Sequence, residues 1–121
     1  YGSSEESARV NETIISVSSL DNKGESTLVT GIPAKTNYSD AEFASMIADF
    51  QAWKKVRMIG SAAMASVYVA AGKAETYQEN GIFLWDIAAG AAIVKAAGGK
   101  INISEISSDF RVNAKFTNGI I

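Results

Sequence analysis

Apolar positions recur along the chain with two different periods, which change from one segment to the next. Short runs rich in β-branched residues are typical of strands, whereas apolar residues spaced three and four apart and alanine-rich stretches indicate helices. The predicted strands are 13–18, 26–30, 56–59, 74–79, 100–104 and 111–116, and the predicted helices are 39–53, 62–71 and 85–97. Strands interleaved with helices indicate the α/β class, as a mixed β-sheet covered by helices.

The first helix has the clearest local signals. Ser39 and Glu42 have the spacing of a capping box, in which the Ser side chain and the residue three positions on satisfy each other's backbone N–H groups. An apolar face follows, made by Phe43, Met46, Ile47 and Phe50. The second helix has almost no polar face, so we expect it to be buried.

The third helix begins beside two acidic residues. Asp86 falls in its first turn, and Glu79 stands just before an Asn80-Gly81 pair that predicts a turn. Asp86 has two readings: a cap that meets free N–H groups at the helix N-terminus, or an oxygen ligand for a hard cation such as Mg²⁺. Glu79 is either a solvated strand end or a hydrogen-bonding partner for substrate hydroxyls. Trp85 is expected in the core.

A second strand-to-helix turn carries small residues, Gly60, Ser61 and Ala62. Backbone N–H groups at such a helix N-terminus can receive an anion. The alternative is that small residues only allow the helix to pack closely on the sheet. The local sequence leaves both readings open.

Composition narrows the chemistry that the chain can perform. Its 121 residues are enough for one domain with one core, and no residue is His or Cys. Imidazole catalysis, thiol catalysis and zinc sites built on Cys or His are therefore excluded. The net charge of −2 argues against a nucleic-acid partner. The longest uncharged run, residues 58–72, is too short to span a membrane and no signal peptide is visible, so we expect a cytoplasmic protein without a membrane partner.

Several of these features occur together and in a fixed order. Gly60-Ser61-Ala62-Ala63 precedes Glu79, and Glu79 precedes Trp85-Asp86-Ile87-Ala88-Ala89-Gly90 with its closing Gly98-Gly99. The combination closely resembles the C-terminal half of the inositol monophosphatase family of Mg²⁺-dependent, lithium-sensitive sugar phosphatases. Weaker similarity extends upstream to Asn11, so the resemblance covers nearly the whole chain and implies the C-terminal lobe of the inositol monophosphatase and fructose-1,6-bisphosphatase fold.

The resemblance implies a role for each candidate residue. The family's aspartate at the position of Asp86 coordinates a catalytic magnesium ion. The glutamate at the position of Glu79 contacts inositol hydroxyls, and the turn matching Gly60, Ser61 and Ala62 lies against the bound substrate. The family's enzymes are dimers, so a homodimer is expected here as well.

One part of the family pattern is absent. The family's Asp-Pro-x-Asp-Gly-Thr motif and an upstream Glu supply most of its metal ligands, and this chain contains no Asp-Pro pair. The resemblance therefore implies that residues 1–121 are a single domain, the C-terminal lobe, whose Mg²⁺ needs ligands from an absent N-terminal half. We expect the chain alone to be inactive, with no complete catalytic set.

Three functions remain open at the level of sequence. The first is hydrolysis of inositol monophosphate or a similar sugar phosphate in a complete enzyme. The second keeps the reaction and changes the substrate to a nucleotide 3′-phosphate, fructose 1,6-bisphosphate or histidinol phosphate. The third is a non-catalytic lobe that binds a partner or associates with itself.

Overall fold

The computed structural model describes residues 9–10, 13–31 and 39–121, so expectations about Asn11 and about residues 1–8 and 32–38 lie outside it. The helices and strands run in the order β1 (Arg9–Val10), β2 (Thr13–Ile14), β3 (Thr27–Thr30), α1 (Asp40–Gln51), β4 (Lys55–Met58), α2 (Ala62–Ala70), β5 (Thr76–Phe83), α3 (Leu84–Ala96), β6 (Lys100–Ile103) and β7 (Arg111–Thr117), with a short 3₁₀ helix η1 at Lys23–Glu25.

The main sheet has five strands in the order β4-β3-β5-β7-β6. The first three run parallel, with Leu28 of β3 opposite Val56 of β4 and Thr76 of β5. β7 pairs antiparallel with both β5 and β6. The expected α/β class and mixed sheet are thus confirmed, and β1 and β2 form a separate antiparallel pair.

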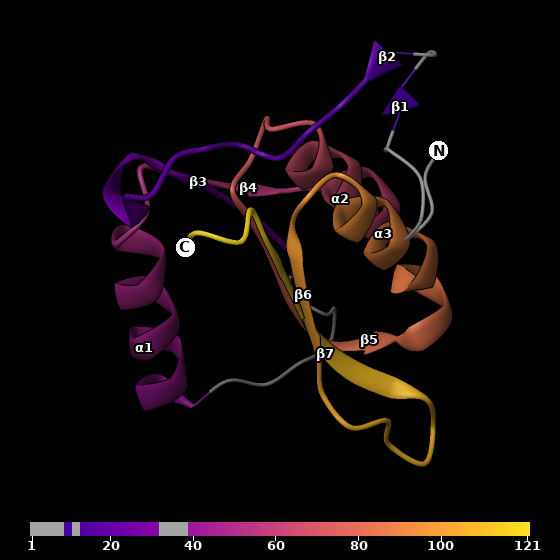
Figure 1. The fold of residues 1–121 in the computed structure, drawn as a ribbon. Helices are drawn as coiled ribbons and strands as arrows, with labels where there is room; N and C mark the ends of the chain where they lie inside the picture. The colour runs from indigo at the N-terminus through magenta and orange to yellow at the C-terminus, as the bar shows by residue number, and fades with distance from the viewer. Residues whose placement is uncertain (1–8, 11–12, 32–38) are drawn as a thin grey trace.

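Helices α2 and α3 lie side by side against one face of this sheet (Figure 1). The side chains between them and the strands form the core, and the largest apolar members that are fully buried are Tyr77, Phe116, Ile87, Val29, Val69, Val94 and Val112. Along β7, Val112, Ala114 and Phe116 are buried and the residues between them are exposed. Alternate side chains of a strand point to opposite faces, so the apolar residues of β7 all face the helices.

Helix α1 stands apart from the α2–α3 pair (Figure 1). Its predicted capping box is present: Ser39 accepts a hydrogen bond from the Glu42 backbone N–H, and the Glu42 side chain accepts one from the Ser39 N–H. None of its residues is buried, and Phe43 is 52% exposed. The helix is thus formed by local signals, while its apolar face has little to pack on within the described residues.

Several expectations about element boundaries are wrong. The first predicted strand is only Thr13–Ile14, and the helix predicted over 39–53 ends at Gln51. Helix α2 is only half buried, since Met64 is exposed. Asn80-Gly81 is not a turn between elements, because β5 continues through it to Phe83.

Trp85 is not a core residue, since it is 62% exposed in the first turn of α3. Its ring instead stacks on Phe83, with ring centroids 4.7 Å apart. No helix in the described part of the chain has the length and apolar character needed to cross a membrane.

Candidate functional site

A cavity of about 570 Å³ opens where the parallel strands β3 and β4 end and where α2 and α3 begin. In an open α/β sheet, this edge is where ligands bind, because strand ends and helix N-termini face the same space. The lining residues are Gly31, Ile59, Gly60, Ser61, Ala62, Ala63, Glu79, Gly81, Ile82, Phe83 and Asp86. All five candidate residues from the sequence, Glu79, Asp86, Gly60, Ser61 and Ala62, therefore lie around one cavity.

Asp86 reaches this cavity from the first turn of α3. The N-cap position belongs to Phe83, and α3 has no side-chain capping hydrogen bond. Asp86 therefore does not act as the cap that the sequence allowed. Its carboxylate is exposed and sits at the positive end of the helix dipole, where a negative charge is stabilised.

Glu79 reaches the cavity from the middle of β5 rather than from a strand end. One of its carboxylate oxygens, Oε1, accepts a hydrogen bond of 2.9 Å from the Tyr77 hydroxyl. Tyr77 is buried, and burial raises the pKa of its hydroxyl, with smaller contributions from the negative charges of Glu79 and Asp86. Tyr77 therefore stays protonated and remains a hydrogen-bond donor.

The turn from β4 into α2 forms the third wall. Ser61 is the N-cap of α2, and its side chain accepts a hydrogen bond of 3.2 Å from the Met64 N–H. The first backbone N–H groups of any helix have no acceptor within the helix. Because Ala62 and Ala63 line the cavity, this helix start offers donors to an anion there.

A bulge in β5 shapes the fourth wall. Glu79 pairs with Ala114 and Ile82 with Val112, so β5 carries one more residue than β7 over this stretch. The extra residue turns Ile82 to the same face as Glu79, and Gly81 adopts a positive φ of 69°, which glycine tolerates without steric cost.

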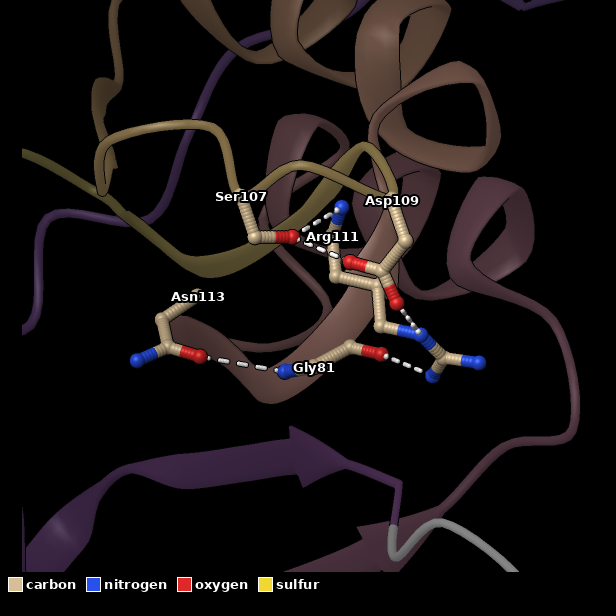
Figure 2. A network of polar contacts seen from close by, with 5 residues as sticks. All are labelled: Gly81, Ser107, Asp109, Arg111 and Asn113. Atoms are coloured by element: carbon tan, nitrogen blue, oxygen red, sulfur yellow. Dashed lines mark hydrogen bonds and ion pairs between the residues drawn. The ribbon is translucent and has the colours of Figure 1, made fainter.

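Side chains from β7 hold the bulge in place (Figure 2). Asn113 Oδ1 accepts a hydrogen bond of 3.0 Å from the Gly81 N–H, and the Arg111 guanidinium donates one of 2.9 Å to the Gly81 carbonyl. Arg111 is itself held by Asp109 through an ion pair of 3.0 Å, and Ser107 hydrogen-bonds to Asp109. Both backbone polar groups of Gly81 are thus satisfied at the edge of the cavity.

The charge of the cavity is negative. Among the described residues that line it, only Glu79 and Asp86 ionise, and both are acids. Carboxylate oxygens are the donors that Mg²⁺ prefers, so the donor chemistry suits this ion. The described residues nevertheless contain no group of three or more acidic, His or Cys side chains that could hold a metal ion, so the set is incomplete within them.

Sequence reasoning missed several residues of the site. Gly31, Phe83, Arg111 and Asn113 line or shape the cavity without any local signal that marks them. Tyr77 was also missed, although the sequence carries a signal that could have identified it. It precedes Glu79 by two positions, and residues two apart on a strand lie on the same face.

Fold and site together define an α/β protein with an acidic cavity, facing a helix N-terminus, at the end of its parallel strands. The model of the inositol monophosphatase family matches residues 1–107, and the chain therefore belongs to this family. The chain is 39% identical over 97 residues to "Nus factor SuhB" of Pasteurella multocida, a match that covers 79% of this chain and 36% of the relative.

Two further comparisons agree with this assignment. A "Fructose-1,6-bisphosphatase/inositol-1-monophosphatase" of Thermotoga maritima is 40% identical over 70 residues, which are 56% of this chain and 27% of that protein. The structure of an inositol monophosphatase from Anabaena superposes with a TM-score of 0.77 at 33% identity, over 92% of this chain and 45% of that one. The chain therefore spans between about a quarter and a half of each relative's length.

Proposed function

We propose that this chain carries one wall of the active site of a Mg²⁺-dependent phosphate monoester hydrolase, with inositol monophosphate or a similar sugar phosphate as substrate. The observation that carries the proposal is the meeting of Asp86, Glu79 and the start of α2 around one cavity. Family membership supports phosphatase chemistry, and the acidic lining supports a cation in the cavity.

Each wall has a distinct task in this proposal. Asp86 is the residue that would hold Mg²⁺, because its carboxylate is exposed and lines the cavity. A bound magnesium ion supplies neutralisation of phosphate charge and a lowered pKa for a coordinated water. The start of α2 would lie against the bound ester, with the N–H groups of Ala62 and Ala63 as donors to its phosphate, and Glu79 would orient the hydroxyl groups of the polyol.

The proposal includes the expectation that the chain alone neither binds Mg²⁺ tightly nor turns over substrate. A hard cation of this kind takes six ligands in near-octahedral geometry, and one exposed aspartate with a neighbouring glutamate leaves most positions to water. The remaining ligands would come from an N-terminal half of the kind that its longer relatives contain.

The test compares the chain alone with a chimeric enzyme, and Asp86→Asn is the control variant. The purified chain is assayed with Mg²⁺ and inositol monophosphate, and so is a chimera in which residues 1–121 replace the matching part of the Anabaena inositol monophosphatase. We expect no turnover by the chain and Mg²⁺-dependent phosphate release by the chimera, reduced at least about 100-fold by Asp86→Asn, which removes the ligand charge without changing side-chain size. A chimera whose activity survives Asp86→Asn would contradict the role of Asp86.

The substrate is tested on the same chimera. Inositol monophosphate, fructose 1,6-bisphosphate and a nucleotide 3′-phosphate are compared by kcat/KM. Glu79 favours a ligand with several adjacent hydroxyl groups, so we expect the inositol ester to be preferred and the preference to shrink in Glu79→Gln. A preference for the nucleotide would contradict the inositol assignment.

A specific observation also favours self-association as a second candidate function. Phe43 and Ile47 lie one turn apart on α1 and are both exposed, and a contiguous exposed apolar face of this kind can mark an interaction surface. We propose that the protein forms a homodimer. Sedimentation of the chain at increasing concentration should show a concentration-dependent dimer, and a monomer at all concentrations would contradict it.

A further inference from the structure

We propose that Tyr77 and Gly31 are positioning residues that together hold the Glu79 carboxylate in its place in the cavity. The inference rests on the proposed function, in which Glu79 orients the hydroxyl groups of the substrate. It goes beyond that function because neither Tyr77 nor Gly31 needs to touch the substrate for its role.

Tyr77 fixes one carboxylate oxygen from inside the core. Its side chain is 1% exposed, and its ring meets Phe116 edge-on with centroids 5.6 Å apart. The hydroxyl of this packed ring donates a hydrogen bond of 2.9 Å to Glu79 Oε1. A buried hydroxyl that loses its acceptor is costly, so the bond orients both partners.

Gly31, directly after the neighbouring strand β3, leaves room for the same carboxylate. A Cβ atom at position 31 would stand 2.6 Å from Glu79 Oε1 and 2.8 Å from Glu79 Cδ. Real Cβ atoms do not approach so closely, so any side chain at this position would displace the carboxylate. The absence of a side chain at Gly31 is therefore what allows Glu79 to occupy this place.

The two contacts act from different parts of the chain on one group. Tyr77 lies on the same strand as Glu79, whereas Gly31 follows β3, which pairs parallel with β5. Oε1 is engaged by Tyr77, and among the described residues none donates a hydrogen bond to Oε2, which can therefore accept one from a ligand. The flexible Glu79 side chain is thereby held in one orientation before the substrate arrives. This lowers the conformational-entropy cost of binding.

The first experiment asks whether Tyr77 and Glu79 are coupled, independently of catalysis. Urea unfolding is measured for the 121-residue chain and for Tyr77→Phe, Glu79→Met (which removes the acceptor oxygens at similar side-chain length) and the double variant, with Tyr68→Phe as the matched control. Tyr68 is a half-buried tyrosine of α2 that does not line the cavity. We expect the double variant to have a free energy of unfolding no lower than that of the less stable single variant, because each single change already breaks the Tyr77–Glu79 hydrogen bond. Strictly additive effects would overturn the proposal.

The second experiment separates positioning from a purely structural role. Steady-state kinetics are measured on the chimera described above with inositol monophosphate. We expect Tyr77→Phe, Gly31→Ala and Glu79→Gln each to raise KM about tenfold with little change in kcat, and the Tyr77→Phe/Glu79→Gln pair to add nothing further. A variant Tyr77→Phe whose KM equals that of the parent would overturn the positioning role.

The two experiments also separate this inference from the proposed function. A chimera that is inactive with the unchanged lobe contradicts the proposed function, and the unfolding cycle then decides the Tyr77–Glu79 coupling on its own. An active chimera with additive Tyr77 and Glu79 effects supports the proposed function and overturns the positioning inference.

Discussion

Gly90 of α3 lies directly against Ser66 of α2, and a Cβ atom at position 90 would stand 2.6 Å from Ser66 Cβ. Ser66 is fully buried and donates its hydroxyl hydrogen to the Ala62 carbonyl at 2.8 Å, so it has no freedom to move aside. This contact explains the small residues of α3: they let the two helices approach closely enough to cover one face of the sheet.

We therefore expect Gly90→Ala to destabilise the chain, although alanine is the better helix former. Overpacking of a close contact costs about 1–3 kcal/mol, more than the ~1 kcal/mol gained in helix propensity. Urea unfolding measures the difference, with Gly60→Ala as control, because a Cβ at Gly60 meets nothing within 4 Å. An unchanged unfolding midpoint for Gly90→Ala would show that the helices separate easily.

The Ser107–Asp109–Arg111 network predicts a pH dependence of stability. The hydrogen bond from Ser107 and, to a smaller extent, the charge of Arg111 lower the pKa of Asp109 below its usual value. A carboxyl whose pKa is lower in the folded state stabilises the fold above its unfolded pKa of about 4, and this contribution is lost as the pH falls through the folded pKa. We expect the free energy of unfolding of Asp109→Asn to fall less steeply than that of the parent chain as the pH drops below about 4. Above pH 6, the pH dependence of the two should be the same.

The same network holds the bulge at Gly81, so its loss has a local signature. Arg111→Gln removes the ion pair with Asp109 and weakens the contact with the Gly81 carbonyl. Amide hydrogen exchange should quicken around residues 79–83 while the α2–α3 core stays protected. Lys115→Gln, a charge change on the same strand outside this network, serves as the control.

The two tryptophans of the chain should respond differently to a quencher. Trp85 is 62% exposed on α3, whereas Trp53 is 7% exposed. Iodide should therefore quench the component of fluorescence that Trp85→Phe removes, and quench little of what remains. If the emission of Trp85→Phe were quenched as strongly as that of the parent chain, Trp53 would have to be the accessible ring.

Helix α1 should be the least protected helix in hydrogen exchange. It buries no residue, and its start depends on the capping box of Ser39 and Glu42. Loss of an N-cap serine costs about 1 kcal/mol, so Ser39→Ala should quicken exchange throughout residues 40–51 without affecting α2. Protection of α1 equal to that of α3 would show that another surface covers it in solution.

The helices and strands were largely predictable because their signals are local. The capping box at Ser39, the glycines after α3 and the alternation along β7 each depend on residues a few positions apart. The predictions failed where contacts with residues distant in sequence decide the local conformation. Asn80-Gly81 reads as a turn, yet Asn113 and Arg111 on β7 satisfy Gly81 and keep it in a bulged strand.

Trp85 shows the same limit for burial. Large apolar residues tend towards the core, but Trp85 lies in the first turn of α3 and is exposed. Its partner is Phe83, two positions earlier, rather than a core strand. Which side of a helix is covered depends on the packing of the whole layer.

The sequence by itself determined the chemical inventory and the local elements of this protein. It established that no His or Cys is present, that Asp86 opens a helix, and that Glu79 and the Gly60–Ser61–Ala62 turn are the candidates for binding. Only the tertiary structure decided that these residues share one cavity, and that Gly31 makes room for a carboxylate 48 positions away that Tyr77 holds. Those contacts follow from the parallel pairing of β3 with β5, and pairing between distant strands is set by the packed core rather than by neighbours along the chain.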